Sequence, residues 1–452
     1  MPSDKFRHQL RQEAEQWLSE GLIDPSIYKQ LADRYQFSEL ESAARKRFIA
    51  ILLVLGSLLL GLGIITFVAA NWQVWPRELK VLLLLGMFVG FNTAGFYLWR
   101  RQNKGWQSLL GQGLLLVGAL ALGANMALMS QMFHKSEPIY QFYLVWGLGV
   151  LMMAYTLRLT WLGMLAVFLI SMGYLRGQGQ PEFLVFGELY WLRLMVQNMP
   201  VVAALLFIPL AYRCHSRWIF RCGAIAVVYS LEAILIRLNL LAAPAWIAAI
   251  ACTLPPALLW GYRDSLWGER ASATQLFEGT ARNLAIAFLS LLFFLLSFYG
   301  MWNTSFMPST RDASVLPGYV LVDLLILGSF TIWEWQRLLR SLDFNNILVA
   351  IAIAISGLVP YWHLRTGTLG IVAVLIFNLL LFLLAISLIR QGLALVERRF
   401  FWGGMVLLSL QIFSRMREYN TDLLFKSLVL LFCGCGIIAA GLWFEHYVRS
   451  KS

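Results

Sequence analysis

Runs of apolar residues long enough to cross a bilayer recur along almost the whole chain, from Phe48 to Trp443. A helix that crosses the hydrocarbon core needs about 20 mostly apolar residues, because the core is about 30 Å thick and each residue adds about 1.5 Å. The chain is 59% hydrophobic and only 13% charged, whereas soluble domains carry roughly 25% charged residues. A soluble fold could not shield so much apolar side chain from water. The sequence therefore predicts an all-α, polytopic bundle of transmembrane helices.

The apolar runs divide into about fourteen predicted spans. The fifth, sixth and thirteenth of them are short. A further candidate, Phe183–Val196, contains Glu188 and Arg193 and has only about 14 residues, so we interpret it as an interfacial helix rather than a span. The predicted spans are 48–70, 79–98, 108–130, 139–157, 159–175, 198–212, 219–237, 241–261, 282–301, 316–334, 346–363, 367–388, 400–414 and 424–445.

Basic residues indicate the orientation of these spans. If the N-terminus is inside, Lys and Arg are about twice as frequent in the inner connections as in the outer ones, which is the bias typical of cytoplasmic loops. The cluster Arg45-Lys46-Arg47 directly precedes the first span. No small-residue cleavage site follows that span, so we expect it to stay in the protein as a signal anchor. The sequence predicts an N-in, C-in topology.

Residues 1–44 are the only sizeable polar segment, and 45–452 form the predicted multi-span domain. The segment reads as a cytoplasmic helical hairpin. Its first helix runs from Asp4 to Glu20 and ends at Gly21. The pair Asp24-Pro25 supplies an N-cap and a first-turn proline for a second helix through Tyr35. Each helix has an apolar stripe, consisting of Leu10, Ala14, Trp17 and Leu18 in the first and of Ile27, Leu31 and Tyr35 in the second.

So small a hairpin cannot form a core of its own. We therefore expect it to pack on the membrane domain or to bind a cytoplasmic protein partner.

Small residues at four-residue spacing predict close helix contacts. Gly86, Gly90 and Ala94 follow this pattern in the second span, and Ser57 and Gly61 follow it in the first. Such spacing lets two helix backbones approach each other.

Composition and motifs argue against several classes of function. The net charge of +12 could indicate nucleic acid, but the basic residues are clustered between apolar runs, which fits membrane orientation better than phosphate binding. The five Cys residues lack zinc-ligand spacing. The chain contains no Walker A, H-E-x-x-H or G-x-S-x-G motif. We expect no nucleic acid, no metal and no cofactor.

Two carboxylates lie inside predicted spans, where ionisable groups are costly and often functional. They are Glu232 in the seventh span and Asp323 in the tenth. A structural interpretation stays open for both. Glu232 could pair with Arg237, although five residues is a poor spacing for a helical pair, and Asp323 could hydrogen-bond to a neighbouring helix. Two amides nearer the middle of spans, Asn92 and Asn378, are candidates for interhelical hydrogen bonds.

A second polar set gathers at the predicted outer ends of the first three spans. If these spans pack together, the set could line one polar vestibule, and a proton or cation could move between it and the two carboxylates. The alternative is a hydrogen-bonded cluster of loop residues. The set consists of Asn71, Lys80, Asn125, Gln131 and His134.

Several motifs resemble a bacterial family of predicted membrane proteins known as domain of unknown function 2157. The likeness covers residues 10–155 and, more loosely, 390–445. It implies the architecture, a multi-pass protein of the bacterial inner (cytoplasmic) membrane or another internal membrane, and it implies no activity. The matching residues are Trp17, Gly21-Leu22-Ile23, Ala70-Asn71-Trp72, Pro76, Lys80, Gly123-Ala124-Asn125, Gln131, His134 and Trp146, then Arg399, Gly403, Arg415, Asp422 and Ser427.

Three functions fit these observations. The first is transport or flipping of a small or amphiphilic solute, indicated by the many spans and by the carboxylates within them. The second is a non-catalytic membrane scaffold or assembly factor that docks partners at the hairpin. A membrane-embedded enzyme is the least favoured, because no large domain outside the membrane is present to bind a soluble substrate. The oligomeric state cannot be read from the sequence.

Overall fold

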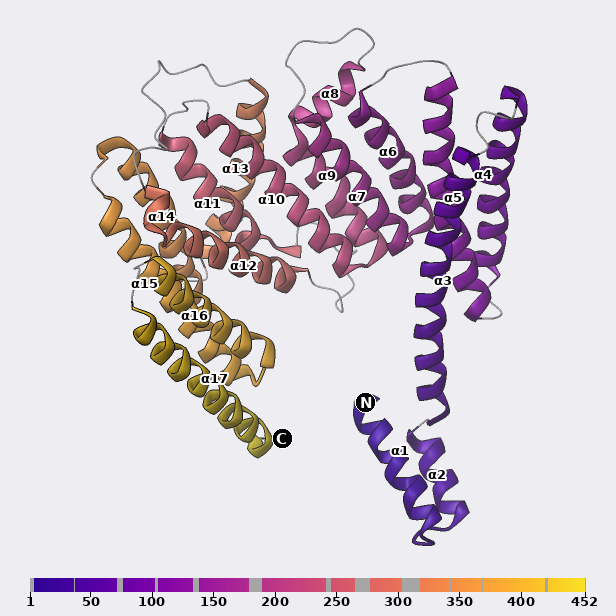
Figure 1. Cartoon of the computed structure of the whole chain (residues 1–452), viewed down its shortest axis with the longest axis horizontal. Coiled ribbons are helices and arrows are strands. Elements are labelled where there is room, and N and C mark those ends of the chain that lie inside the picture. The colour runs from indigo at the N-terminus through magenta and orange to yellow at the C-terminus, as the bar shows by residue number, and fades with distance from the viewer. Residues whose placement is uncertain are drawn as a thin grey trace. The chain divides into compact units, whose positions relative to one another are not determined.

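The computed structural model describes residues 4–35, 37–70, 76–101, 105–132, 138–178, 189–240, 245–264, 277–302, 318–340, 343–367, 369–418 and 422–451. Every regular element within these ranges is a helix (Figure 1). The chain forms two compact units, Met1–Leu189 and Tyr190–Ser452, which we call unit 1 and unit 2. The all-α prediction is confirmed.

Unit 1 contains the N-terminal hairpin and five longer helices. Its elements are α1 (Asp4–Ser19), α2 (Pro25–Tyr35), α3 (Phe37–Ala70), α4 (Arg77–Arg100), α5 (Gly105–Met132), α6 (Ile139–Leu157) and α7 (Thr160–Gly177). Unit 2 contains α8 (Tyr190–Gln197), α9 (Met199–Cys214), α10 (Arg217–Leu240), α11 (Ala245–Gly261), α12 (Glu278–Leu296), the short 3-10 turn η2 (Tyr299–Trp302), α13 (Gly318–Leu339), α14 (Phe344–Thr366), α15 (Gly370–Leu395), α16 (Arg398–Glu418) and α17 (Leu423–Lys451).

The hairpin has the helix boundaries that its sequence predicts. Gly21 has φ +72°, a left-handed conformation that glycine adopts without steric cost and that ends α1. Ala14 is fully buried between α1 and α2. The apolar stripe of α2 differs from the prediction, because Tyr28, Ala32 and Tyr35 face α1 while Ile27 is exposed. Tyr35 was predicted correctly.

Helix α3 is continuous from Phe37 to Ala70 (Figure 1). It therefore crosses the boundary predicted between the hairpin, residues 1–44, and the multi-span domain, residues 45–452. Helix α5 packs against both α3 and α4. Ser57 is buried, and a Cβ atom on Gly61 would lie 2.7 Å from Leu120 of α5, so this small-residue pair does permit close packing. The first three predicted spans therefore pack together.

The stripe Gly86, Gly90 and Ala94 makes no such contact. A Cβ on Gly86 or Gly90 would meet nothing within 4 Å among the described atoms. The close approach of α4 to α5 instead uses Gly95 and Gly111, since a Cβ on Gly111 would lie 2.4 Å from the backbone nitrogen of Trp99.

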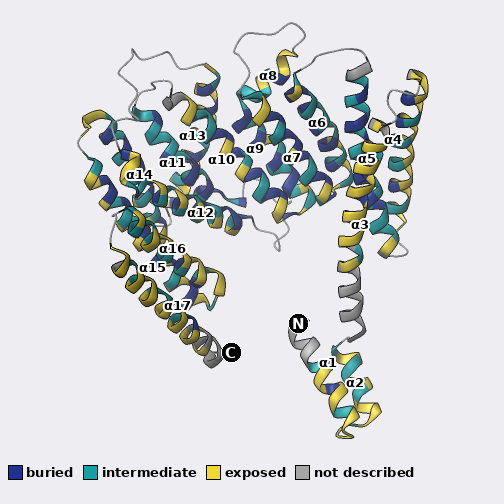
Figure 2. Cartoon of the chain, viewed as in Figure 1, coloured by how far each residue is buried: buried dark blue, intermediate teal, exposed yellow. Residues whose placement is uncertain are grey.

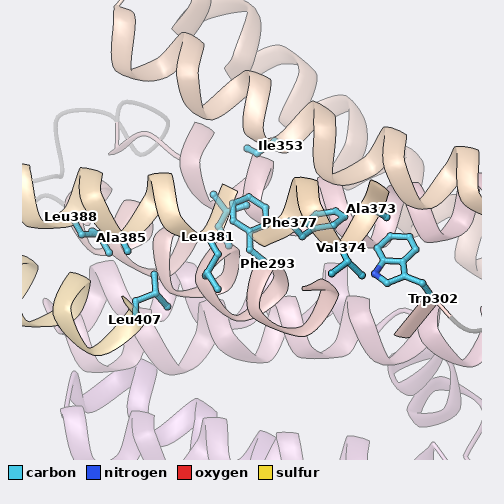
Figure 3. Close-up of a cluster of buried hydrophobic side chains, with 11 residues drawn as sticks. Phe293, Trp302, Ile353, Ala373, Val374, Phe377, Leu381, Ala385, Leu388 and Leu407 are labelled. Atoms are coloured by element: carbon cyan, nitrogen blue, oxygen red, sulfur yellow. The ribbon is translucent and has the colours of Figure 1, made fainter. Parts of the chain in front are cut away.

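One apolar cluster in unit 2 is centred on α15. Figure 3 shows Phe377 and Leu381 of α15 close to Phe293 of α12, with Trp302 of η2 at one end of the cluster. The Trp302 and Phe377 rings stack with their centroids 5.7 Å apart. Helices α12, η2, α14 and α16 are thus held around α15.

Many large apolar side chains point outward, and exposed positions are frequent along α4 and α17 (Figure 2). Leu82 of α4 and Phe432 of α17 are each more than two-thirds exposed (73% and 74%). Such exposure is unfavourable in water and costs little in lipid.

Ten helices in the described ranges are long and apolar enough to cross a membrane, or eleven if the bent pair α8–α9 forms one span. The other predicted spans correspond to α3, α11 and α16. The described apolar part of α3, Ile51–Ile64, and α11 are shorter than a typical span.

Helix α8 is bent by 89° relative to α9. Such a bent pair is either a broken span or a re-entrant segment, so the interfacial interpretation of Phe183–Val196 stays a prediction, and residues 183–188 lie outside the described ranges.

Candidate functional site

Two of the predicted vestibule residues, Asn71 and His134, lie outside the described residues. Gln131 lies near the end of α5, and its side chain is also outside the description. The structure describes the side chains of the other two vestibule residues, Lys80 and Asn125.

Lys80 and Asn125 belong to the same helix interface. Asn125 of α5 donates a hydrogen bond to the carbonyl of Leu84 in α4 at 3.1 Å, and another to Ala121 in its own helix at 2.8 Å. Lys80 is buried, 8% exposed, and lies one turn before Leu84. Residues four apart share a helix face, so both candidates lie on the α4–α5 contact. Asn125 acts there as an interhelical clamp.

Glu232 lies in α10, and its Oε1 atom is buried without a hydrogen-bond partner among the described residues. The predicted partner, Arg237, is exposed and lies five residues further on, about 140° around the helix axis. The Oε1 atom of Glu232 therefore points into the helix packing.

Asp323 lies on α13 and is only 2% exposed. Both of its carboxyl oxygens are buried, and within the described ranges neither accepts a hydrogen bond. The structure therefore does not supply the structural hydrogen bond that was the alternative interpretation for this residue. Burying a carboxyl group without such a bond costs about 2–7 kcal/mol, and an ionised one costs more.

Glu232 and Asp323 lie beside the same apolar cluster. The cluster joins Leu231 of α10, Ile247 of α11 and Leu327 of α13. Leu231 adjoins Glu232 in sequence, and Leu327 lies one turn after Asp323. Both α10 and α13 pack against α11. The structure thus brings the two candidates into one three-helix region of unit 2, and their link to the vestibule of unit 1 stays a prediction.

A third buried carboxylate, Glu334, was missed by sequence reasoning. It lies near the end of α13, where the predicted span ends, and is 1% exposed. Both of its oxygens lack a hydrogen-bond partner in the part of the chain that the structure describes. Its spacing from Asp323 is the signal that could have found it, because eleven residues are close to three full helical turns and place both side chains on one face.

A hydrogen-bonded network surrounds this end of α13. Asp264, which follows α11, accepts a short hydrogen bond from the hydroxyl of Tyr212 and another from the backbone nitrogen of Glu278 at 3.0 Å. The Tyr212 and Tyr262 hydroxyls are 2.7 Å apart. Glu278 in turn pairs with Arg282 at 2.6 Å. These bonds hold the ends of α9 and α11 to the start of α12.

The other end of unit 2 has a separate network around Ser297, at the end of α12. Arg415 of α16 donates hydrogen bonds to the Ser297 carbonyl at 2.7 Å and to its hydroxyl at 3.2 Å. Asn378 of α15 donates to the same carbonyl at 3.2 Å and accepts from Gln411 through its own carbonyl at 2.9 Å.

Asn378 therefore forms the interhelical hydrogen bonds predicted for it. The other mid-span amide, Asn92, donates to Phe88 in its own helix and lies against Gly118 of α5.

Metal ligation finds no support within the described residues, which contain no group of three or more His, Cys, Asp or Glu side chains placed to hold a metal ion.

The all-helical fold, with its ten candidate spans and outward apolar side chains, defines a membrane protein. Residues 15–163 match the model of a family described as predicted membrane protein (DUF2157), which confirms the resemblance over the first third of the chain. The matched segment begins within α1 and ends in α7, so the looser likeness at 390–445 lies outside it. No curated protein and no solved structure matches the chain.

Proposed function

We propose that the protein moves a small or amphiphilic solute across its membrane. The observation that carries the proposal is Asp323, a carboxyl group buried in a candidate span with neither oxygen hydrogen-bonded to a described residue. A bundle with a purely structural role gains nothing from such a group, since apolar residues of similar volume pack as stably. Ionisable groups kept inside membrane helices commonly mark a path for ions or solutes.

The solute is best sought by comparing a deletion strain with the same strain carrying the gene on a plasmid. We expect one class of metabolite or lipid to change its distribution across the membrane in the deletion strain and to recover with the plasmid. Unchanged metabolites and lipids, with altered membrane protein complexes instead, would favour a scaffold over a transporter.

The proposed topology has fourteen spans with both termini in the cytoplasm, in a bacterial inner membrane or another internal membrane. The ten candidate spans, together with α3, α9, α11 and α16, supply that number of helices. The basic residues of the inner connections support the orientation.

Reporter fusions test this topology. Fusions at Lys104, Arg270 and Ser452 are expected to read cytoplasmic, and fusions at Lys135 and Arg311 external. All five positions lie outside the described residues, in connections or at the end of the chain. A cytoplasmic signal at Lys135 or an external one at Ser452 would overturn the span count.

The second candidate function is a membrane scaffold or assembly factor, favoured by the surface of the hairpin. Leu22 and Ile27 are 68% and 47% exposed, and they lie on either side of the Asp24-Pro25 turn. Neither takes part in the cluster around Ala14. Exposed apolar residues on a segment outside the bilayer are suited to binding a protein partner.

Deleting residues 1–40 removes the hairpin and tests its docking role. Insertion is expected to be almost unchanged, because Arg45-Lys46-Arg47 and the first span remain. Binding of any cytoplasmic partner is expected to weaken, as measured by co-purification in mild detergent. The double substitution Leu22→Ser and Ile27→Ser tests the exposed surface alone, since it leaves the helix contact at Ala14 intact, and it is expected to weaken partner binding as the deletion does. An identical set of co-purifying proteins for all three forms would count against docking.

A further inference from the structure

One face of α13 is buried along the whole helix. The buried residues recur every three or four positions, as expected for a single helical stripe, and are Val320, Asp323, Leu327, Thr331, Glu334 and Leu338. The helix packs against α11, and also against α9 and α14. Near one end, the Trp335 indole donates a hydrogen bond to the Ala257 carbonyl of α11 at 2.8 Å. Polar and apolar residues thus share one buried face of α13.

Two of these residues are carboxylates without a hydrogen bond from any described group, Asp323 and Glu334. Eleven residues separate them, about 16 Å along the axis and within about 20° around it. Thr331 lies between them and donates to the Leu327 carbonyl at 2.7 Å. The two carboxyl groups therefore lie towards opposite ends of one buried face, too far apart to touch.

The charges around Glu334 differ from those of a simple ion pair. A Cβ on Gly261 at the end of α11 would lie 3.5 Å from the Glu334 Cβ, so Arg263, two residues after Gly261, lies near this carboxyl group, as does Arg337, one turn further along α13. Arg337 lies over the Trp333 ring, 3.8 Å from its centroid, and Glu278 pairs with Arg282.

Among the described residues, further ionisable groups at this end include Tyr212 and Arg213 at the end of α9, Tyr262 and Asp264 after α11, Arg340 directly after α13 and Asp343 before α14. Tyr212, Tyr262 and Asp264 are hydrogen-bonded to one another. Within the described ranges, Glu334 is the fully buried acid of this cluster whose oxygens accept no hydrogen bond.

We infer that Glu334 is a proton-binding site, and that with Asp323 it forms the two ends of a proton path along the α11–α13 contact. Proton uptake from water forms an O–H bond on the carboxyl group and removes its negative charge, which relieves the cost of burial. Release returns the proton to water and leaves a carboxylate that Arg263 and Arg337 stabilise. In the proposed topology Glu334 lies towards the inner side and Asp323 towards the outer side. This path rests on the proposed transport function and makes the proton the ion that is coupled to solute transport.

Infrared difference spectroscopy of the full chain in lipid vesicles tests the site without any solute. A protonated carboxyl group that makes no hydrogen bond has a C=O stretching band separate from that of hydrated acids. We expect such a band to appear reversibly as the pH is lowered and to shift in D₂O. Glu334→Gln is expected to remove one component of the band, and Asp323→Asn the other. Glu397→Gln is the matched control, because Glu397 is exposed, and it is expected to leave the band unchanged.

Proton movement is measured on the same vesicles with a trapped pH-sensitive dye and an imposed membrane potential. Glu334→Gln and Asp323→Asn are each expected to abolish proton entry, and Glu397→Gln to leave it intact.

Absence of the Glu334 component in the wild type, whatever the solute data show, would overturn the site and leave the transport proposal standing. A component that is present, together with unchanged solute distribution in the deletion strain, would uphold the site and overturn transport. Unaltered proton entry in both carboxamide variants would overturn the path.

Discussion

Asp323→Asn and Glu232→Gln are expected to reach the membrane in wild-type amounts and yet fail to restore the deletion strain. Each substitution keeps the shape of the side chain and removes its ability to ionise. A carboxamide of the same shape has no charge to bury, and burying a charge costs more than burying a neutral polar group, so the substitution should not weaken the fold. Loss of function with retained folding is therefore the result that a transport role requires. It is measured by complementation, with membrane abundance and thermal unfolding in detergent recorded for the same samples.

Glu397→Gln makes the same chemical change at an exposed site between α15 and α16, and it should complement fully. Full complementation by both buried variants would contradict a functional role. A fall in thermal stability that parallels the loss of function would instead assign Glu232 and Asp323 a role in packing.

Local sequence signals predicted the parts of the fold that depend on local chemistry. Gly21 marks the end of α1, and Asp24-Pro25 marks the start of α2. Both signals are local, because a left-handed residue and a first-turn proline fix the backbone dihedral angles at their own positions. The face of α2 depends on α1, and there the prediction for Ile27 was wrong. Tyr28 and Ala32 pack beside Ala14, and Ile27 lies outside that contact.

Small-residue spacing shows the same limit. Ser57 and Gly61 do meet α5, whereas Gly86 and Gly90 meet no described atom. Such spacing makes a close approach possible, but only the three-dimensional arrangement decides which partner uses it. The candidate site was likewise only partly predictable from local sequence. Asp323 was recognisable because it interrupts an apolar run, whereas Glu334 lies among Trp and Arg at a span end, where only its eleven-residue spacing from Asp323 distinguishes it.

The contact between α15 and α16 provides an internal comparison of two adjacent glycines. A Cβ on Gly404 would lie 2.6 Å from the Ala385 carbonyl oxygen and 3.0 Å from the Ile389 backbone nitrogen, both on α15. A Cβ on Gly403 would meet nothing within 4 Å among the described atoms. Ala385 and Leu407, one turn after Gly404, belong to the cluster of Figure 3.

Gly404→Leu is therefore expected to be strongly destabilising, and Gly403→Leu is expected to be tolerated. Backbone atoms cannot move aside as a flexible side chain does, so a side chain at 404 must push α16 away from α15 and disrupt the packing of Leu407. Overpacking of this kind costs about 1–3 kcal/mol or more, whereas an exposed Leu at 403 replaces a poor helix former with a good one. Thermal unfolding in detergent and the folded yield from membranes should both fall for Gly404→Leu and stay near wild type for Gly403→Leu. Equal behaviour of the two variants would mean that α15 and α16 do not pack through Gly404 in the membrane, and the core around Phe377 would then need a different arrangement.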